Sequence, residues 1–239
     1  MESMSHEERR SRLARRHYLA VAATDVTTVA RDLIGLHSSD PTAVYLSCRA
    51  RLPDFTVADL ETALYDHRTL LRLLGMRRTM FVVTPEVAAM MNAACTRSYL
   101  APQRRRLVRY LEDQGVTSDG DAWLAAVEAR TLSALHRLGE ATANELREVV
   151  PELQAKLSFG EGKTWGGQVG VSTRVLFLLA TGNRIVRARP RGSWISSQYR
   201  WALLRIGIRK ACLSSTSHGR SKSWQNDGCT PLGRERFRI

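Results

Sequence analysis

The chain has 239 residues, 44% of them apolar, and a formal net charge of +13 at pH 7. This length can bury one large core or two smaller ones, and the ordinary apolar content argues against disorder throughout. No apolar run is long enough to span a bilayer, and the first residues lack the apolar core of a signal peptide. We therefore expect a globular, cytoplasmic protein with no membrane partner.

The positive charge is carried mainly by arginine, with 32 arginines among the 36 cationic residues. Residues 1–202 hold 28 cationic and 21 anionic side chains (+7), whereas residues 203–239 hold 8 and 2 (+6). A basic surface favours polyanions, because neutralising phosphates releases counterions. A GC-rich genome would also enrich arginine, so the charge alone leaves nucleic-acid binding and coding bias both open.

The four cysteines, Cys48, Cys95, Cys212 and Cys229, are far apart in the sequence. They form no C-x-x-C pair, and no histidine accompanies them at the spacing of a metal site. We expect reduced thiols, as in the cytoplasm, and neither a metal nor another cofactor.

The first predicted element is a basic helix over residues 6–20, which has acidic residues near its start. Its few large apolar side chains are Leu13, Tyr18 and Leu19. We expect these three to pack the helix against the first domain.

Two helices and a hairpin are predicted next. Apolar residues at helical spacing predict a helix over Val26–His37, and Asp40-Pro41 has the pattern of an N-cap and first residue of the following helix. A capping-box pattern opens another amphipathic segment, Thr56–Arg68. A basic turn joins the strand-like runs Leu70–Leu74 and Thr79–Val83. This order is typical of a winged helix-turn-helix, which docks on duplex DNA.

A helical stretch is predicted after the hairpin. Thr84-Pro85-Glu86 is a strong start signal for a helix that runs to Leu100. Pro102 is expected to break it, and Gln103–Gln114 to continue as a separate helix. The polar segment Val116–Gly120 is the best internal linker, so we place a domain boundary there.

The second half of the chain repeats the same order of elements. Helices are predicted at 121–138, 142–150 and 168–181, and strands at 185–189 and 194–201. A Gly-rich loop is expected before the third of these helices. We therefore predict a mainly α fold with small β-hairpin wings, in which tandem winged helix-turn-helix modules occupy residues 1–115, with a helical extension, and 116–202.

The last segment, residues 203–239, has no sustained apolar period and carries two of the four cysteines. One interpretation is an irregular, disordered basic tail. Composition, cysteine usage and pattern all change together at its start, so our preferred hypothesis is a reading-frame shift near residue 202. An uninterrupted single frame on resequencing would contradict it.

Gly160-Glu161-Gly162-Lys163-Thr164 looks like part of a phosphate-binding loop. The first glycine of G-x-x-x-x-G-K-[ST] would have to stand at residue 157, which is leucine, and no clear strand precedes the segment. We therefore interpret it as a turn and expect no nucleotide cofactor.

Three groups of side chains are candidates for contacts with DNA. A mixture of Gln, Ser, Thr and Arg at the start of a recognition helix suits groove edges and phosphates. Arginines that alternate outward along a wing could hold the backbone or enter a minor groove, although they could equally keep an exposed strand soluble. The candidates are Arg77, Arg78 and Thr79 in the first hairpin, Lys163, Thr164, Gln168, Ser172, Thr173 and Arg174 near the helix start, and Arg187, Arg189 and Arg191 in the second hairpin.

One polar cluster, His37, Ser39 and Asp40, is suited to catalysis. His37 also continues the apolar stripe of the predicted helix and could simply end it, while Asp40 has a structural role as an N-cap. The sequence contains neither a G-x-S-x-G elbow nor an H-E-x-x-H motif.

Four segments, Val29–Pro41, Tyr45–Leu52, Arg72–Val83 and Gly192–Ile195, form a joint pattern. It resembles the AlkZ/YcaQ-like winged-helix DNA glycosylases over about residues 8–202. The resemblance implies tandem winged helices that form a concave channel for DNA. It further implies excision of N-alkylated or crosslinked purines by a Gln-x-Gln motif on the stretch that matches Leu36–Ser39.

This chain departs from the family pattern, because His37 and Ser39 replace the two glutamines. His37 could position or deprotonate water, and Asp40 could stabilise a cationic sugar. The family also has a third winged helix, which residues 203–239 do not resemble. We therefore predict a duplex DNA-binding protein, and our more specific hypothesis is that it is a monofunctional DNA glycosylase. The alternatives are a non-catalytic DNA-binding or transcription-regulatory protein and, third, a protein–protein module; the oligomeric state is left open.

Overall fold

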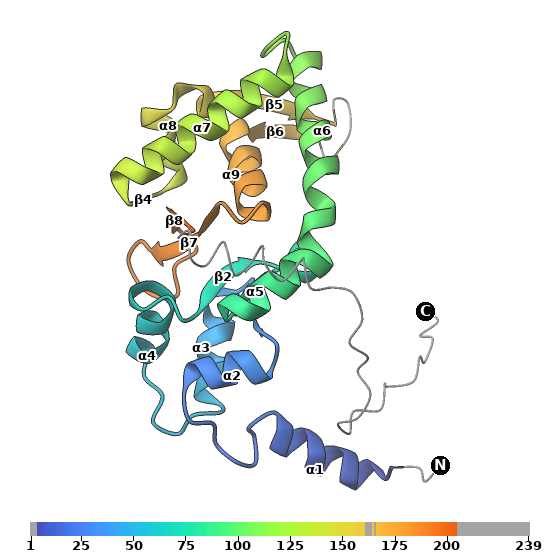
Figure 1. Cartoon of the computed structure of the whole chain (residues 1–239), viewed down its shortest axis with the longest axis vertical. Helices are drawn as coiled ribbons and strands as arrows, with labels where there is room; N and C mark the ends of the chain where they lie inside the picture. The colour runs from blue at the N-terminus through green and yellow to red at the C-terminus, as the bar shows by residue number, and fades with distance from the viewer. Residues whose placement is uncertain (1–3, 161–163, 165, 205–239) are drawn as a thin grey trace.

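A computed structural model describes residues 4–160, 164 and 166–204 of the chain. The molecule is elongated, with the N-terminal helices at one end and the helices of the second half at the other (Figure 1). Helices predominate, and the strands form a six-stranded and a two-stranded antiparallel sheet. This confirms a mostly helical protein with short antiparallel strands.

The N-terminal half follows the predicted order of elements, and its capping signals are confirmed. Asp40 caps α3, and Thr56 and Asp59 form the capping box of α4. Thr84 caps α5, which opens on a proline. The elements are α1 (His6–Arg16), α2 (Val26–Asp32), β1 (Leu36–His37), α3 (Pro41–Arg49), α4 (Val57–Glu61), η1 (Thr62–Asp66), β2 (Leu71–Leu74), η2 (Met76–Arg78), β3 (Met80–Val83) and α5 (Pro85–Met91).

The prediction that a helix reaches His37 is wrong, because α2 ends at Asp32. Ile34 and Gly35 follow with φ of 58° and 109°, and their amides donate to the carbonyls of Arg31 and Ala30. This is a Schellman termination in which isoleucine occupies the left-handed position that glycine usually takes. No sequence signal marks it, because β-branched residues rarely adopt positive φ.

The predicted packing of α1 is also wrong. None of its residues is buried, and Leu13 and Leu19 are 45% and 59% exposed. Polar contacts attach its C-terminal end instead: Tyr18 donates to the Asp32 carboxylate, and Arg51 donates to the His17 carbonyl.

Pro102 does not separate two helices. It lies inside α6 (Arg97–Asp113), which continues the helical path of α5 through η3 (Asn92–Thr96). An internal proline costs one backbone hydrogen bond. Burial of Leu107 and Leu111 from the same helix outweighs this cost. The long helix runs along one side of the molecule and connects its two ends (Figure 1).

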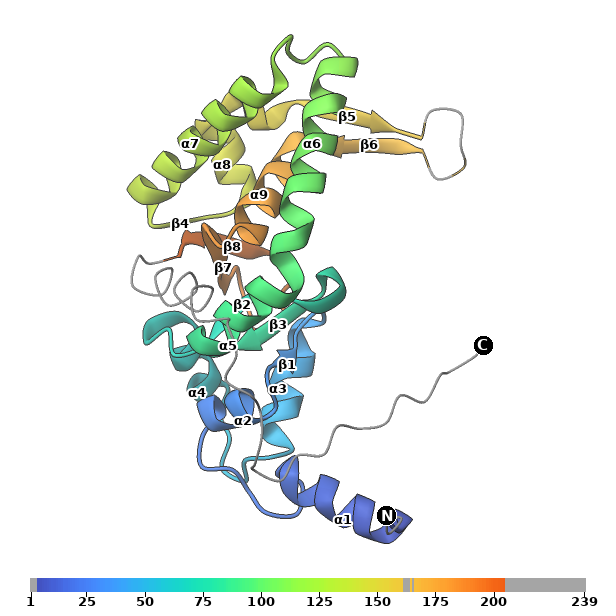
Figure 2. The ribbon, with the colours of Figure 1, turned by 45° about the vertical axis from the view of Figure 1, so that its right-hand side comes forward.

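The second half contains one hairpin that the sequence did not predict. The segment interpreted as a Gly-rich loop contains β5 and β6, which project from the body of the molecule (Figure 2). As a result, the following helix begins at Val171 rather than at Gln168. The elements are α7 (Gly120–Leu138), β4 (Glu140–Ala141), α8 (Ala143–Val149), η4 (Pro151–Gln154), β5 (Lys156–Phe159), β6 (Gly167–Gly170), α9 (Val171–Thr181), β7 (Ile185–Pro190) and β8 (Tyr199–Leu203).

The predicted tail lies almost wholly outside the described residues. Its first two residues do not fit the prediction: Leu203 ends β8, and Leu204 is 5% exposed. Residues 205–239 are not among those that the structure describes.

The two predicted wing hairpins pair with each other and do not stand apart. The strand order of the large sheet is β1-β3-β2-β7-β8-β4, and Arg72 of β2 is paired with Arg187 of β7. Paired residues of an antiparallel sheet lie on the same face. One face therefore carries Leu36, Val82, Arg72, Arg187 and Trp201, and the other carries His37, Phe81 and Leu73.

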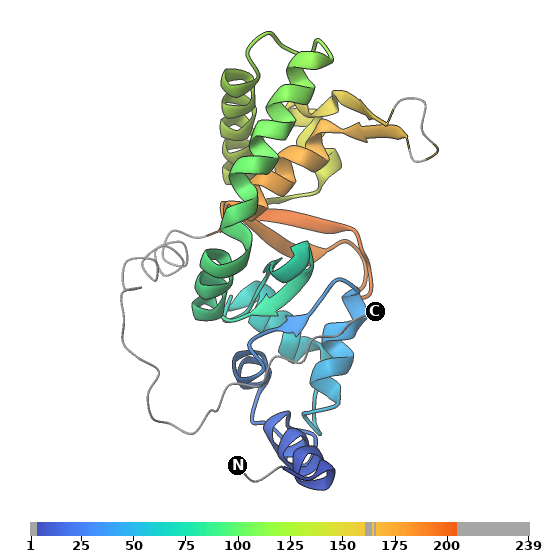
Figure 3. The same ribbon diagram turned by 90° about the vertical axis from the view of Figure 1, so that its right-hand side faces the viewer.

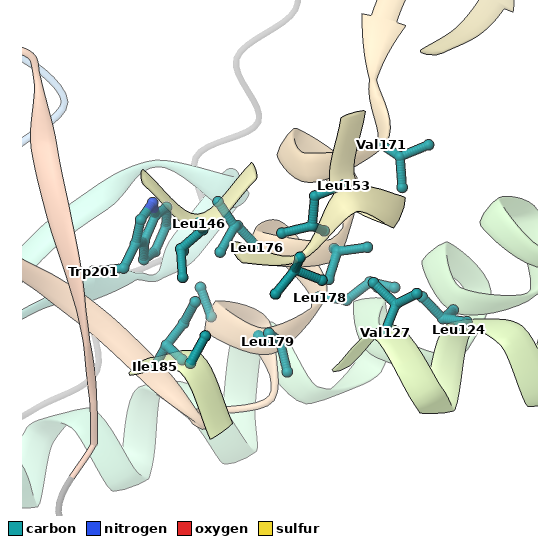
Figure 4. Packing of buried hydrophobic residues seen from close by; sticks show 14 of the residues in the cluster. Leu124, Val127, Leu146, Leu153, Val171, Leu176, Leu178, Leu179, Ile185 and Trp201 are labelled. Carbon is teal, nitrogen blue, oxygen red and sulfur yellow. The ribbon is translucent and has the colours of Figure 1, made fainter. Parts of the chain in front are cut away.

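Three apolar clusters pack the helices against the large sheet. On one face of the sheet, Leu71, Leu73 and Val186 pack against α5. The opposite face is covered at two ends: Leu36 and Val82 pack with α2 and α3, and Ile185 and Trp201 pack with α7, α8 and α9. Figure 4 shows the last of these clusters. Arg72 and Arg187 lie on the face between the two covered ends.

Candidate functional site

The segment His37–Asp40 lies at the edge of the large sheet. Gly35 turns the chain out of α2, and β1 then pairs Leu36 with Val82 and His37 with Phe81. Beyond the strand, the Ser38 amide donates to the Met80 carbonyl at 2.8 Å. Because strand residues alternate, Leu36 and Ser38 are buried while His37 and Ser39 are exposed.

His37 and Ser39 form a small polar unit. The Ser39 hydroxyl lies 3.2 Å from His37 Nε2 and accepts a hydrogen bond from the Met80 amide at 3.3 Å. The imidazole meets the Phe81 ring edge-on, with centroids 5.5 Å apart. Both side chains are thus oriented by β3 while facing solvent. The alternative interpretation of a histidine that simply ends a helix is wrong.

Asp40 is the N-cap of α3. Its carboxylate accepts hydrogen bonds from the Thr42 hydroxyl at 2.6 Å and the Thr42 amide at 2.7 Å. These bonds hold the pKa of Asp40 below its usual value. The side chain is therefore a permanent anion at neutral pH. Within the described residues it is hydrogen-bonded to Thr42, while His37 is bonded to Ser39.

Arg72 lies beneath this segment and was not predicted as a functional residue. Its guanidinium donates to the Ser38 carbonyl and to the Tyr199 hydroxyl, and it stacks over the Tyr199 ring at 4.2 Å. Arg72 is 4% exposed, so it supports the catalytic candidates from inside the protein. The available signal was a charged residue in the middle of the apolar run Leu70–Leu74.

The basic tip of the first hairpin faces solvent. Arg77 and Arg78 are exposed, and both have left-handed backbone, with φ of 54° and 62°. Within the described part of the chain neither forms a salt bridge. The Thr79 hydroxyl donates to the Met76 carbonyl at 2.8 Å. Thr79 directly precedes Met80, whose amide donates to the Ser39 hydroxyl. Arg77 and Arg78 are therefore only three and two residues away from that hydrogen bond.

The second hairpin places its arginines differently. The predicted alternation is confirmed, because Val186, Ala188 and Pro190 are buried between them. However, Arg187 stacks over the Trp201 ring at 4.0 Å, and burial lowers its pKa to about 10. Arg189 is paired with the carboxylates of Glu61 and Asp66, and Arg191 is the one exposed arginine of these three.

The predicted recognition-helix residues do not share one exposed surface. Gln168 is exposed, but on β6, while Ser172 is 3% exposed within the first turn of α9. The Arg174 guanidinium stacks on Phe159 at 5.0 Å. Thr164 and Thr173 are exposed, and Lys163 lies outside the described residues.

The sheet separates the candidates into two groups. His37 is on the face of Phe81 and Leu73, whereas Arg187 is on the face of Arg72. His37 and Arg187 therefore do not share one surface of the sheet. Seen from the side, the β5–β6 hairpin, the β7–β8 connection and α3 lie along one edge of the molecule (Figure 3).

The described residues include no helix that is both long and apolar enough to cross a bilayer. Nor do they bring together three or more His, Cys, Asp or Glu side chains in a position to hold a metal ion.

Fold and site together define a mostly helical protein with a central antiparallel sheet and an exposed His–Ser pair at its edge. The family model described as DNA glycosylase AlkZ-like matches residues 30–209. The chain belongs to the AlkZ-like DNA glycosylase family.

Among solved structures, Streptomyces sahachiroi DNA glycosylase AlkZ is similar, with 17% sequence identity and a TM-score of 0.53. The alignment covers 83% of this chain and 49% of that chain, so the present chain spans about half the length of that protein. At this identity the likeness concerns the fold alone. No curated protein sequence matches.

Proposed function

We propose that this protein binds duplex DNA and hydrolyses the N-glycosidic bond of N-alkylated or crosslinked bases. The observation that carries the proposal is the exposed His37–Ser39 pair, at the positions that the family resemblance matches to the two glutamines of the motif. The family membership of the chain supports the reaction class.

The chemistry requires two things of the protein. Cleavage of a glycosidic bond passes through an oxocarbenium-like sugar, so a water must be positioned and positive charge stabilised. His37 Nε2 and the Ser39 hydroxyl together can hold and deprotonate a water. Asp40, whose lowered pKa keeps it ionised, supplies negative charge beside them. An N-alkylated base already carries positive charge and leaves easily, so no strong general acid is needed.

The exposed cations supply the proposed DNA contacts. Arg77 and Arg78 extend from the hairpin tip next to Ser39, and Arg191 and Gln168 lie on the β7–β8 connection and β6. Thr79 and Arg174 can assist at their flanks. Ser172 is buried, and Arg187 and Arg189 would have to break existing contacts to reach a phosphate. We therefore expect these three residues to stabilise the fold and not to contact DNA.

Two further expectations are part of the proposal. We assign tandem winged-helix modules to residues 1–115 and 116–202, although Leu107 and Leu111 of α6 pack with the second unit. We also expect a cytoplasmic location.

A base-release assay tests the proposal. The full chain is incubated with a duplex that carries an N-alkylated purine, and abasic sites are counted. We expect release that His37→Ala lowers by roughly 10²- to 10⁴-fold, the usual contribution of general acid–base catalysis. Duplex affinity should stay unchanged, and His67→Ala, at another exposed histidine, is the matched control. Equal release by wild type and His37→Ala would remove the assignment.

A non-catalytic DNA-binding or regulatory protein is the second candidate. The replacement of both family glutamines, by His37 and Ser39, favours it. A footprint at a defined sequence, with no base release from any lesion tested, would establish this alternative. Absence of salt-dependent DNA affinity would instead indicate a protein–protein module.

A further inference from the structure

Two arginines lie side by side in the middle of the large sheet. Arg72 and Arg187 are directly paired across β2 and β7, and their side chains share one face. Arg72 is 4% exposed, and its buried Nε has no hydrogen-bond partner among the residues that the structure describes. Arg187 is covered by the Trp201 and Tyr199 rings, at 4.0 Å and 5.2 Å from its guanidinium carbon.

In the part of the chain that the structure describes, neither Arg72 nor Arg187 forms a salt bridge, whereas the neighbouring Arg189 binds both Glu61 and Asp66. Burial, together with the nearby charge of Arg72, lowers the pKa of Arg187 to about 10. Buried cations without counterions are costly, and stacking on aromatic rings offsets only part of that cost.

Both arginines line the same cavity. It has a volume of about 250 Å³ and lies where β2 and β7 meet α9. No acidic side chain among the described residues lines it, and most of its wall is apolar, including Leu74, Leu176, Phe177 and Trp201. A ligand held there would be surrounded by two arginines together with hydrocarbon and aromatic side chains.

We propose that Arg72, Arg187 and this cavity form a binding site for a small organic anion, with a carboxylate or phosphate group on a flat apolar body. A guanidinium presents a planar fork of donors that matches both oxyanions. The aromatic wall suits a ring. The volume is below the roughly 300 Å³ at which pockets for drug-sized ligands begin, so the ligand is the size of a single substituted ring.

A small organic anion suits this site better than the backbone of a nucleic acid. A backbone phosphodiester carries a sugar on each side, whereas the cavity has a volume of about 250 Å³ and largely apolar walls. An N-alkylated base is also unsuitable, because its positive charge would be repelled by the two arginines. The cavity shares Arg72 and Met80 with the surroundings of the His37–Ser39 pair, but the proposed ligand is of a different chemical class, so its binding does not depend on the proposed glycosylase activity.

Isothermal titration of the full chain with phenyl phosphate and with benzoate tests the site. We expect one molecule to bind per chain and benzyl alcohol, which is neutral, not to bind. Arg187→Gln should weaken binding at least about tenfold, as loss of a charge-assisted contact does. Arg184→Gln, at an exposed arginine just before β7, is the matched control and should leave affinity within about twofold.

A second variant protects the test against misfolding. Thr173 is exposed at the wall of the cavity, so Thr173→Phe should block the space without touching either guanidinium. Thermal melts monitor whether each variant is folded. No binding of either anion at millimolar concentration, or equal affinity in wild type, Arg187→Gln and Thr173→Phe, would overturn the proposal. The proposal would also be overturned if neither anion bound while Arg187→Gln weakened duplex binding. In that case the phosphates of DNA would be the partner of Arg187.

Discussion

Gly35 controls the direction in which the chain enters the candidate site. It has φ of 109° and lies immediately before β1, the strand that carries His37. A Cβ atom at this position would meet Val83 Cγ1 at 2.7 Å and Phe81 Cδ1 at 3.5 Å. Gly35→Ala therefore introduces both backbone strain and steric overlap at the start of the catalytic segment.

The magnitude follows from these two contributions. Holding a non-glycine residue at such a φ costs about 1 to 3 kcal/mol. Overlap with Val83, a stiff and fully buried side chain, adds about 1 to 3 kcal/mol. We expect Gly35→Ala to lower the free energy of unfolding by about 2 to 6 kcal/mol in total.

Urea unfolding followed by circular dichroism measures this change, and Gly115→Ala is the matched control. Gly115 also has positive φ, 67°, but a Cβ there meets nothing within 4 Å. The control should therefore lose only about 1 to 2 kcal/mol, from strain alone. If the two variants lost the same free energy, or Gly35→Ala changed stability by less than about 0.5 kcal/mol, the reasoning about Val83 would be refuted.

Three further predictions concern the same structure. Ile34→Gly should raise the free energy of unfolding by about 1 kcal/mol in urea titration, because it relieves a left-handed β-branched residue at the end of α2. Burial raises the pKa of Cys48 to about 12, so iodoacetamide should modify native Cys48 more slowly than Cys95, as peptide mass mapping can show; equal rates would contradict this. Hydrogen bonds from Thr42 lower the pKa of Asp40 below 3.8, so its contribution to stability is full above that value and is lost as the pH falls below it. Thermal melts from pH 6 to pH 2 should therefore show the gap between wild type and Asp40→Asn closing at the acid end; a constant gap would count against the role of the carboxylate.

Local signals in the sequence predicted much of the secondary structure. The Thr56–Asp59 capping box and the Asp40-Pro41 and Thr84-Pro85 starts are confirmed, and the helix predicted from residue 142 opens with a capping box of Thr142 and Glu145. Each depends on side chains within three residues of a helix start, so short-range chemistry is sufficient to specify it. The strand-like runs at β2 and β3 and the alternating run at β7 were also recognised from their own residues.

The errors arose where distant contacts outweighed local preference. Ile34 adopts a conformation that its own side chain disfavours, and α6 tolerates Pro102 because packing of the helix compensates for it. The hairpin of β5 and β6 was missed because the sequence from Pro151 to Gly167 is rich in turn-forming residues.

The sequence by itself determined that the chain is basic and mostly helical, where most of its helices begin, and which short segment is suited to catalysis. The tertiary structure decided what each polar residue does. Strand pairing placed His37 and Arg187 on opposite faces of the sheet and brought Arg72 beneath Ser38, while Ser172 is buried in the first turn of α9. The physical reason is that the role of a charge depends on its burial and on its neighbours, and both are set by residues far away along the chain.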